Sequence, residues 1–430
     1  MLPLTAVLAL ACSSGVTDPG ELATREAKLA AAAATALSRL PTPTATAFPA
    51  PTATPLPTVT PAPTATPRPI ATPDPSAPTA RDAQSIDIGS PPGDWSGTQP
   101  ISQSLRFISI SPMPDGKALL VGGKDSDGNP SAGVEIYDSR TGEWKPAADL
   151  AFGRYLHTAT TLDNGDVLIT GGWGADFAAF RSTLRYDLAA DLWIQPEPMS
   201  MIRVAHKAVK LRDGAILVAG GWLTNPLAST EIYDPDADEW RSVEDMNVAR
   251  FDHSLTLLPD GRVLAVGGEG IGDERLVSAE IFDPAIGEWT EVAGLSQARF
   301  EHTAGLMPDG RVIVVGGWEV EYLSSAEIFD PETGEWTQAA PLVEARSRHQ
   351  GLQLPNSYFY VTGGIGDDGL IRGSEAYDWQ TDSWVPAGEL RQARFSHKIT
   401  MMDNGDLVAV GGFTESGLTR SAEVLTVGPQ

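Results

Sequence analysis

The sequence predicts an all-β fold: a seven-bladed β-propeller, in which seven four-stranded sheets form a ring. Three observations predict it. A Gly-Gly pair recurs seven times with a spacing of 47 to 49 residues. A tryptophan follows each of the first six pairs, and turn signals divide each unit into four short strand patterns. Repeats of this length with four strands each are typical of propeller blades.

One unit shows how the strands are assigned. Residues 302–306 form the first strand, and Pro-Asp-Gly at 308–310 marks a hairpin turn. The apolar run 311–315 predicts a buried second strand that ends at the Gly-Gly pair. Residues 326–329 are β-branched and aromatic in character and predict the third strand. After a turn, Trp336 opens the fourth strand.

The two ends of this region indicate how the ring closes. The seventh unit stops before its tryptophan strand, whereas Gly93-Asp94-Trp95 precedes the first unit and matches Gly334-Glu335-Trp336. We therefore expect residues 93–101 to supply the fourth strand of the last blade. Pairing the first strand with the last blade removes sheet edges that would otherwise be open.

The order of apolar strand, Gly-Gly pair, segment of the SAEIFD type (278–283 and 325–330) and tryptophan resembles the kelch repeat over residues 93–430. Some kelch-like proteins, with a galactose-oxidase-like central domain, are copper oxidases. They use a cysteine cross-linked to a tyrosine beside copper-binding histidines. The only cysteine here is Cys12, which lies outside the repeats, so we do not expect the resemblance to extend to copper chemistry, and we expect no cofactor. Other kelch-like proteins are sialic-acid epimerases, which implies an acid/base residue and an arginine for the carboxylate.

The N-terminal part of the chain has a different composition. Residues 1–12 resemble a bacterial lipoprotein signal, because an apolar run lies directly before Cys12, which would carry the lipid. A plain secretory signal is the alternative. Residues 13–40 are rich in alanine and predict a helical segment. Residues 41–92 are dominated by proline and threonine and predict an extended stalk before the propeller at 93–430.

Charge and cysteine content exclude several kinds of partner. The formal net charge is −26, and nucleic acid binding needs a basic surface. The same charge opposes docking on anionic lipid, which leaves a lipid anchor as the expected route to a membrane. With a single cysteine, the chain forms no internal disulfide. We expect the propeller to be secreted or held at the cell surface.

Every histidine of the chain closes an Arg-x-x-His motif. Symmetry-related histidines on a ring do not converge on one metal ion. Each arginine could pair with a glutamate of the third strand in the inner packing, or the arginines could form a ring that binds anionic ligands. The motifs break in the first unit, which has Leu105 and Ile108, and in the second, where Arg185 replaces the glutamate. The candidate ligand-binding arginines are Arg154, Arg203, Arg250, Arg299, Arg346 and Arg394.

Aromatic residues after the Gly-Gly pairs are further candidate ligand contacts. Trp173, Trp222 and Trp318 could stack on sugar rings, or they could wedge between blades. No non-repeated motif nominates catalytic residues. The expected function is a binding or scaffold module outside the cytoplasm that recognises a protein or a glycan through its loops. The alternative is a carbohydrate-active enzyme, such as an epimerase or lyase, with its site at a mouth of the central channel.

Overall fold

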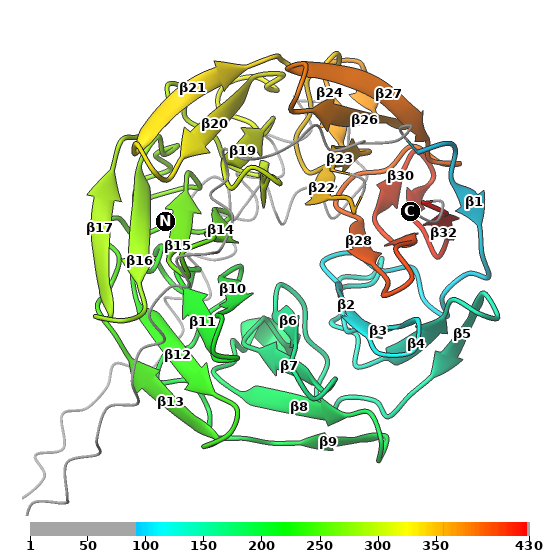
Figure 1. The fold of residues 1–430 in the computed structure, drawn as a ribbon. Coiled ribbons are helices and arrows are strands. Elements are labelled where there is room, and N and C mark those ends of the chain that lie inside the picture. Colours follow the sequence, from blue (N-terminus) through cyan, green and yellow to red (C-terminus); the bar gives the residue numbers. More distant parts are fainter. Residues whose placement is uncertain (1–91, 356, 428–430) are drawn as a thin grey trace, which may run out of the picture. The chain divides into compact units, whose positions relative to one another are not determined.

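The computed structural model describes residues 92–355 and 357–427. Within them, seven four-stranded antiparallel sheets form the blades of a ring (Figure 1). The predicted fold class is therefore confirmed. Cys12, the segments 1–12 and 13–40, and the stalk up to residue 91 lie outside the described residues. Across the described residues, no helix has the length and apolar character that a membrane crossing needs.

The first strand of each blade lies nearest the centre of the ring (Figure 1). These strands are β2 (Ser109–Met113), β6 (Thr158–Thr161), β10 (Lys207–Lys210), β14 (Ser254–Leu257), β18 (Thr303–Leu306), β22 (Gln350–Gln353) and β28 (Lys398–Met401). The second strands are the apolar runs that end at Gly-Gly. They are β3 (Lys117–Val121), β7 (Val167–Thr170), β11 (Ile216–Ala219), β15 (Val263–Val266), β19 (Val312–Val315), β23 (Phe359–Thr362) and β29 (Leu407–Val410).

The third and fourth strands complete each blade toward the rim. The third strands are β4 (Val134–Asp138), β8 (Thr183–Asp187), β12 (Thr230–Asp234), β16 (Ala279–Asp283), β20 (Ala326–Asp330), β26 (Gly373–Asp378) and β32 (Ala422–Leu425). The rim strands are β5 (Glu143–Pro146), β9 (Leu192–Ile194), β13 (Glu239–Ser242), β17 (Glu288–Val292), β21 (Glu335–Ala339), β27 (Ser383–Glu389) and β1 (Ser96–Gly97).

Short elements decorate the loops between second and third strands. They are the 3-10 helix η2 (Ala175–Phe177) and two small hairpins, β24 (Ile365–Gly366) with β25 (Gly369–Leu370) and β30 (Phe413–Thr414) with β31 (Gly417–Leu418). These loops lie at the Gly-Gly end of the ring. Because strands alternate in direction, the turns between first and second strands and between third and fourth strands lie together at the opposite end.

The ring closes as the sequence predicts. Strand β1 pairs with β32, with Ser96 opposite Val424, so the N-terminal strand completes the blade that the C-terminal strands begin (Figure 1). Trp95 is 3% exposed, and its indole nitrogen donates a hydrogen bond of 2.8 Å to the Tyr360 hydroxyl of the preceding blade. Ile101 is also buried, in the cluster shared with the first blade.

The hydrophobic core lies between neighbouring blades. Six of the second strands are buried along their whole length, so they supply apolar side chains to both adjacent interfaces. A tyrosine or phenylalanine in six of the third strands packs against the tryptophan of the neighbouring rim strand at ring-centroid distances of 5.0 to 5.2 Å. These tryptophans explain the second repeat signal in the sequence.

Candidate functional site

The arginines of the Arg-x-x-His motifs have buried side chains that bind their own blade. Arg250 is fully buried and represents the group. Its Nη1 donates to the Gly267 and Ser278 carbonyls at 2.9 and 3.0 Å. Its Nη2 donates to the Ser278 hydroxyl at 3.0 Å and to Glu280 Oε1 at 2.7 Å. One guanidinium therefore ties the Gly-Gly loop and the third strand to the segment before the first strand.

Five blades contain this buried ion pair. The pairs are Arg203–Glu231 (2.7 Å), Arg250–Glu280 (2.7 Å), Arg299–Glu327 (3.0 Å), Arg346–Glu375 (2.7 Å) and Arg394–Glu423. The glutamates also accept backbone hydrogen bonds, as Glu280 does from Asn247 and Val248. The structural alternative predicted this pairing. Ligand binding by these arginines stays a prediction. A ligand would have to displace the glutamate and carbonyl acceptors to which the guanidinium groups already donate.

Burial lowers the pKa of Arg250, and the charge of Glu280 opposes that shift. We expect Arg250→Ala to destabilise the protein by about 3–5 kcal/mol, because it leaves Glu280 buried without its counter-charge. Denaturant unfolding of the variant measures the loss. The exposed Lys145→Gln is the control and should change stability by less than about 0.5 kcal/mol. Equal stability of Arg250→Ala and the parent protein would show that the pair is dispensable.

The second blade departs from the pattern. Arg185 stands in place of the glutamate and lies 3.6 Å from Asp166 instead. Arg154 still donates to the Gly171 carbonyl and the Ser182 hydroxyl. Its guanidinium lies 4.6 Å from the centroid of the Phe180 ring, a cation–π contact. Burial lowers the pKa of Arg154 to about 10.

Four of the six histidines connect one blade to the next through a side-chain hydrogen bond. His157 Nε2 lies 2.7 Å from the Ser109 hydroxyl of the preceding blade, and His349 Nε2 lies 2.9 Å from that of Thr303. His206 and His302 make the same contact with Thr158 and Ser254. Burial lowers the pKa of all six, to about 3 for His157 and His349. These histidines are therefore neutral at pH 7. They are spaced one per blade and do not converge, and the described residues contain no group of three metal-ligating side chains.

Both glycines of each pair are required by the packing around the motif. The backbone N–H of Gly221 donates to the Arg250 carbonyl of the next blade at 2.9 Å. A Cβ on Gly220 would lie 2.5 Å from that carbonyl oxygen, and both glycines have positive φ. The Gly-Gly repeat and the Arg-x-x-His repeat are therefore two sides of one contact between blades.

The tryptophans after the Gly-Gly pairs surround the same end of the ring. Trp173 and Trp222 belong to neighbouring blades and pack at a centroid distance of 5.9 Å. Trp318 packs edge-on against Phe300 at 5.7 Å, and Arg275 lies over both rings. All three tryptophans are half-buried, so they wedge between neighbours and still present some surface. Sugar stacking on that surface stays a prediction.

The position before each histidine, and before Ile108 in the first blade, carries no repeat signal, although Arg348 stands out as a second arginine close to Arg346. It has positive φ in every blade, and backbone hydrogen bonds such as Ser396 N to the Arg348 carbonyl link it to its neighbours. We call these seven positions the inner ring. Their identities differ from blade to blade: Phe107, Leu156, Ala205, Asp252, Glu301, Arg348 and Ser396. Because the residue type changes from blade to blade, the repeat gives no signal for these positions. They can be located only from the arginine and histidine of the Arg-x-x-His motif that flank them in six blades.

The inner ring is charged on one side. Arg348 Nε lies 2.7 Å from Glu301 Oε2. Burial raises the pKa of Asp252, and the charges of Lys207 and Lys398 oppose that shift. Lys207 and Lys398 open two first strands at the position where four other blades carry serine or threonine. Burial lowers the pKa of Lys398 to about 8, with Lys207 adding to the effect. Five charged side chains that break the repeat thus interact near the centre of the ring.

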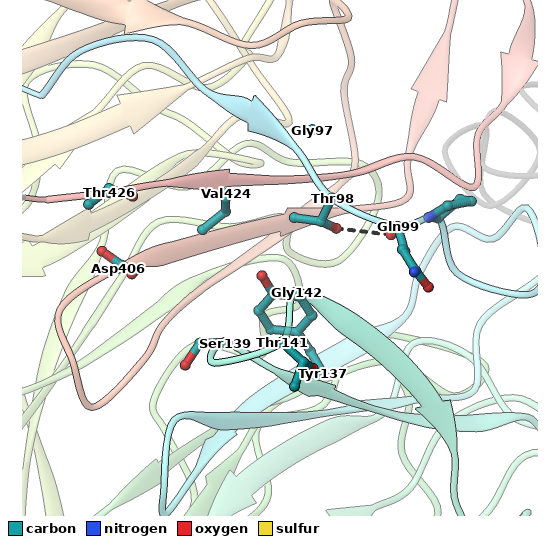
Figure 2. Close-up of a pocket in the computed structure, with 11 residues that line it drawn as sticks. Gly97, Thr98, Gln99, Tyr137, Ser139, Thr141, Gly142, Asp406, Val424 and Thr426 are labelled. Carbon is teal, nitrogen blue, oxygen red and sulfur yellow. Dashed lines mark hydrogen bonds between the residues drawn. The ribbon is translucent and has the colours of Figure 1, made fainter.

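A pocket of about 640 Å³ lies elsewhere, at the seam where the last blade meets the first (Figure 2). We call it the seam pocket. Its lining comes from the segment 97–100, from the first blade and from the last blade. The rim strand of the last blade, β1, has only two residues, and the pocket lies beside it, where the chain runs on to the first blade.

Comparisons with known proteins agree with this architecture. The Kelch motif model matches residues 113–151, 206–247 and 302–343, which fall in the first, third and fifth blades. A sequence comparison with curated proteins found no match. Among solved structures, a fungal alcohol oxidase of the AA5 family in complex with copper aligns with a TM-score of 0.64 and 18% identity over 78% of this chain and 76% of that chain. The structure of YjhT aligns with a TM-score of 0.54 and 14% identity over 67% of this chain and 99% of that chain.

These identities are low enough that the two structures support the fold alone. The motif matches add the family signature in three blades, and the other four blades repeat the same Gly-Gly and strand order. The chain is a seven-bladed β-propeller that carries the Kelch motif in three of its blades.

Proposed function

We propose that this chain is a binding module held outside the cytoplasm, which recognises a protein or glycan through the Gly-Gly end of its propeller. The observation that carries the proposal is that repeated and non-repeated residues have different surroundings. The repeated arginines and histidines bind their own and neighbouring blades. The charges that break the repeat gather on the inner ring and beside it, at Lys207, Asp252, Glu301, Arg348 and Lys398.

A rigid ring with varied residues at one mouth suits recognition, because the scaffold is ordered before the ligand arrives. The half-buried Trp173, Trp222 and Trp318 add apolar surface at the same end. Location outside the cytoplasm is supported by the lipoprotein-like residues 1–12 and the stalk composition of residues 41–92.

The test is binding of the full chain to an array of glycans and cell-wall polymers and to candidate surface proteins. Asp252→Asn and Lys398→Met should weaken a discrete hit at least tenfold without changing the melting temperature. The rim variant Lys145→Gln should leave that hit unchanged. A hit that neither Asp252→Asn nor Lys398→Met affects would overturn the placement of the site.

One observation favours a carbohydrate-active enzyme as the second candidate. Burial lowers the pKa of Lys398 to about 8 and raises the pKa of Asp252, and these two groups interact. Paired groups shifted toward neutrality are typical of acid/base sites. NMR of acidic and neutral sugars incubated with the protein would reveal turnover, and Lys398→Met should abolish it. Unchanged spectra across the panel count for the binding module.

A further inference from the structure

The aromatic residue of the third strand correlates with the residue five positions later, and one blade departs from this correlation. In three blades a tyrosine hydroxyl donates to an aspartate five residues later: Tyr186–Asp191 (2.7 Å), Tyr233–Asp238 (2.7 Å) and Tyr377–Asp382 (2.8 Å). Two blades have phenylalanine with glycine at the same positions, Phe282 with Gly287 and Phe329 with Gly334. Tyrosine thus occurs with its aspartate partner, and phenylalanine occurs where that partner is missing.

The first blade combines Tyr137 with Gly142 and so keeps the hydroxyl without its partner. Tyr137 as a whole residue is 2% exposed, and it lines the seam pocket with no aspartate five residues later to accept from its hydroxyl. A molecule in the pocket would take the place of that acceptor (Figure 2).

Asp406 is the charged member of the pocket lining. Its counterpart in the second blade, Asp166, lies 3.6 Å from Arg185, whereas the lining of the seam pocket contains no cation. The Asp406 charge also helps to raise the pKa of Tyr137, so that hydroxyl stays a neutral donor beside a carboxylate acceptor. A bound group that accepts from Tyr137 and donates to Asp406 fits this arrangement.

The remaining lining favours a ligand rich in hydroxyl groups. Ser139 and Thr426 supply hydroxyls that both donate and accept, and Gln99 supplies an amide. The hydroxyls of Thr98 and Thr141 already donate to backbone carbonyls and keep their capacity to accept. The volume of about 640 Å³ lies within the range of small-ligand sites. The lone carboxylate disfavours anionic ligands, because nothing in the lining would neutralise them.

We propose that the seam pocket binds a neutral saccharide, with the Tyr137 hydroxyl donating to it and the Asp406 carboxylate accepting from its hydroxyl groups. The site lies beside the turns, at the opposite end of the ring from the inner ring. Because the saccharide would contact both the segment 97–100 and the first blade, binding would also hold the ring closed.

The test uses the full chain and a panel of neutral sugars: glucose, galactose, N-acetylglucosamine and their linear trimers. Binding is measured by ligand-observed NMR and by the rise in melting temperature. Tyr137→Phe removes only the hydroxyl, and Phe282 and Phe329 show that phenylalanine fits this position. Gly142→Asp rebuilds the tyrosine–aspartate bond, since a Cβ there meets nothing within 4 Å and Asp191 has positive φ too.

We expect a panel sugar to bind, and both variants to weaken it at least tenfold while remaining folded. The matched control Tyr186→Phe, which lies in the second blade, should keep full affinity. Equal affinity in Tyr137→Phe, Gly142→Asp and the parent protein would overturn the proposal. So would the absence of sugar binding, or binding of a lysine-rich peptide in its place. Asp252→Asn changes only the proposed inner-ring site and should leave sugar binding at the seam pocket intact. Failure of the inner-ring proposal can therefore be distinguished from failure of the seam-pocket proposal.

Discussion

Deleting residues 88–101 should lower the melting temperature by about 10 °C or more, because the last blade then loses its rim strand. The deletion removes Trp95, and replacing a buried tryptophan with alanine alone lowers the free energy of unfolding by about 3–5 kcal/mol. It also removes the buried Ile101 and exposes the edge of β32. Thermal unfolding followed by circular dichroism measures the effect.

The matched control is deletion of residues 41–80, which lie in the proline- and threonine-rich segment. That deletion should leave the melting temperature within about 2 °C of the parent value, because the sequence there has little apolar content to bury. Equal melting temperatures for the two deletions would show that the ring does not depend on its N-terminal strand.

The second large effect is a loss of stability in mild acid. Burial lowers the pKa of all six histidines in the folded protein, whereas an unfolded histidine has a pKa of about 6.5. Below about pH 6.5 the histidines of the unfolded chain therefore bind protons, whereas those of the folded chain stay neutral. Stability is fully present above pH 6.5 and falls as the pH drops toward the folded values, about 3 for His157 and His349.

Each histidine contributes a slope of up to about 1.4 kcal/mol per pH unit in that window. We expect the free energy of unfolding to fall by several kcal/mol between pH 7 and pH 5. His253→Ile follows the precedent of Ile108 in the first blade and should reduce the slope by roughly one sixth. A free energy of unfolding that stays constant from pH 7 to pH 5 would contradict the burial of these groups.

The sequence predicts most of the architecture because the architecture consists of repeated contacts. The Gly-Gly pairs mark where a Cβ would meet the next blade, and the tryptophans mark the rim strands. Gly93-Asp94-Trp95 predicts the closing strand because it copies Gly334-Glu335-Trp336. The arginine–glutamate pairs are foreseen too, since the two residue types recur together and buried charge must be paired.

The candidate sites are harder to predict because they occupy positions where the repeat fails. Asp252 and Arg348 share an inner-ring position whose identity changes from blade to blade, so periodicity gives no signal there. The exception at Tyr137 and Gly142 becomes visible only when the tyrosine–aspartate bonds of the other blades are known. A hydrogen bond between side chains is a property of the folded chain, and residue spacing does not contain it.

Repeated residues hold the ring together, and we propose that non-repeated residues recognise the ligand. The most direct test measures stability and binding to the same glycan and polymer array for Arg250→Lys and Asp252→Asn. Both residues belong to one motif, two positions apart. Lysine cannot reproduce the forked contacts of Arg250, so Arg250→Lys should lose stability and, where folded, keep its ligand. Asp252→Asn should keep stability and lose the ligand. The reverse pattern, a stable Arg250→Lys that no longer binds, would contradict the account and make the arginines the ligand site.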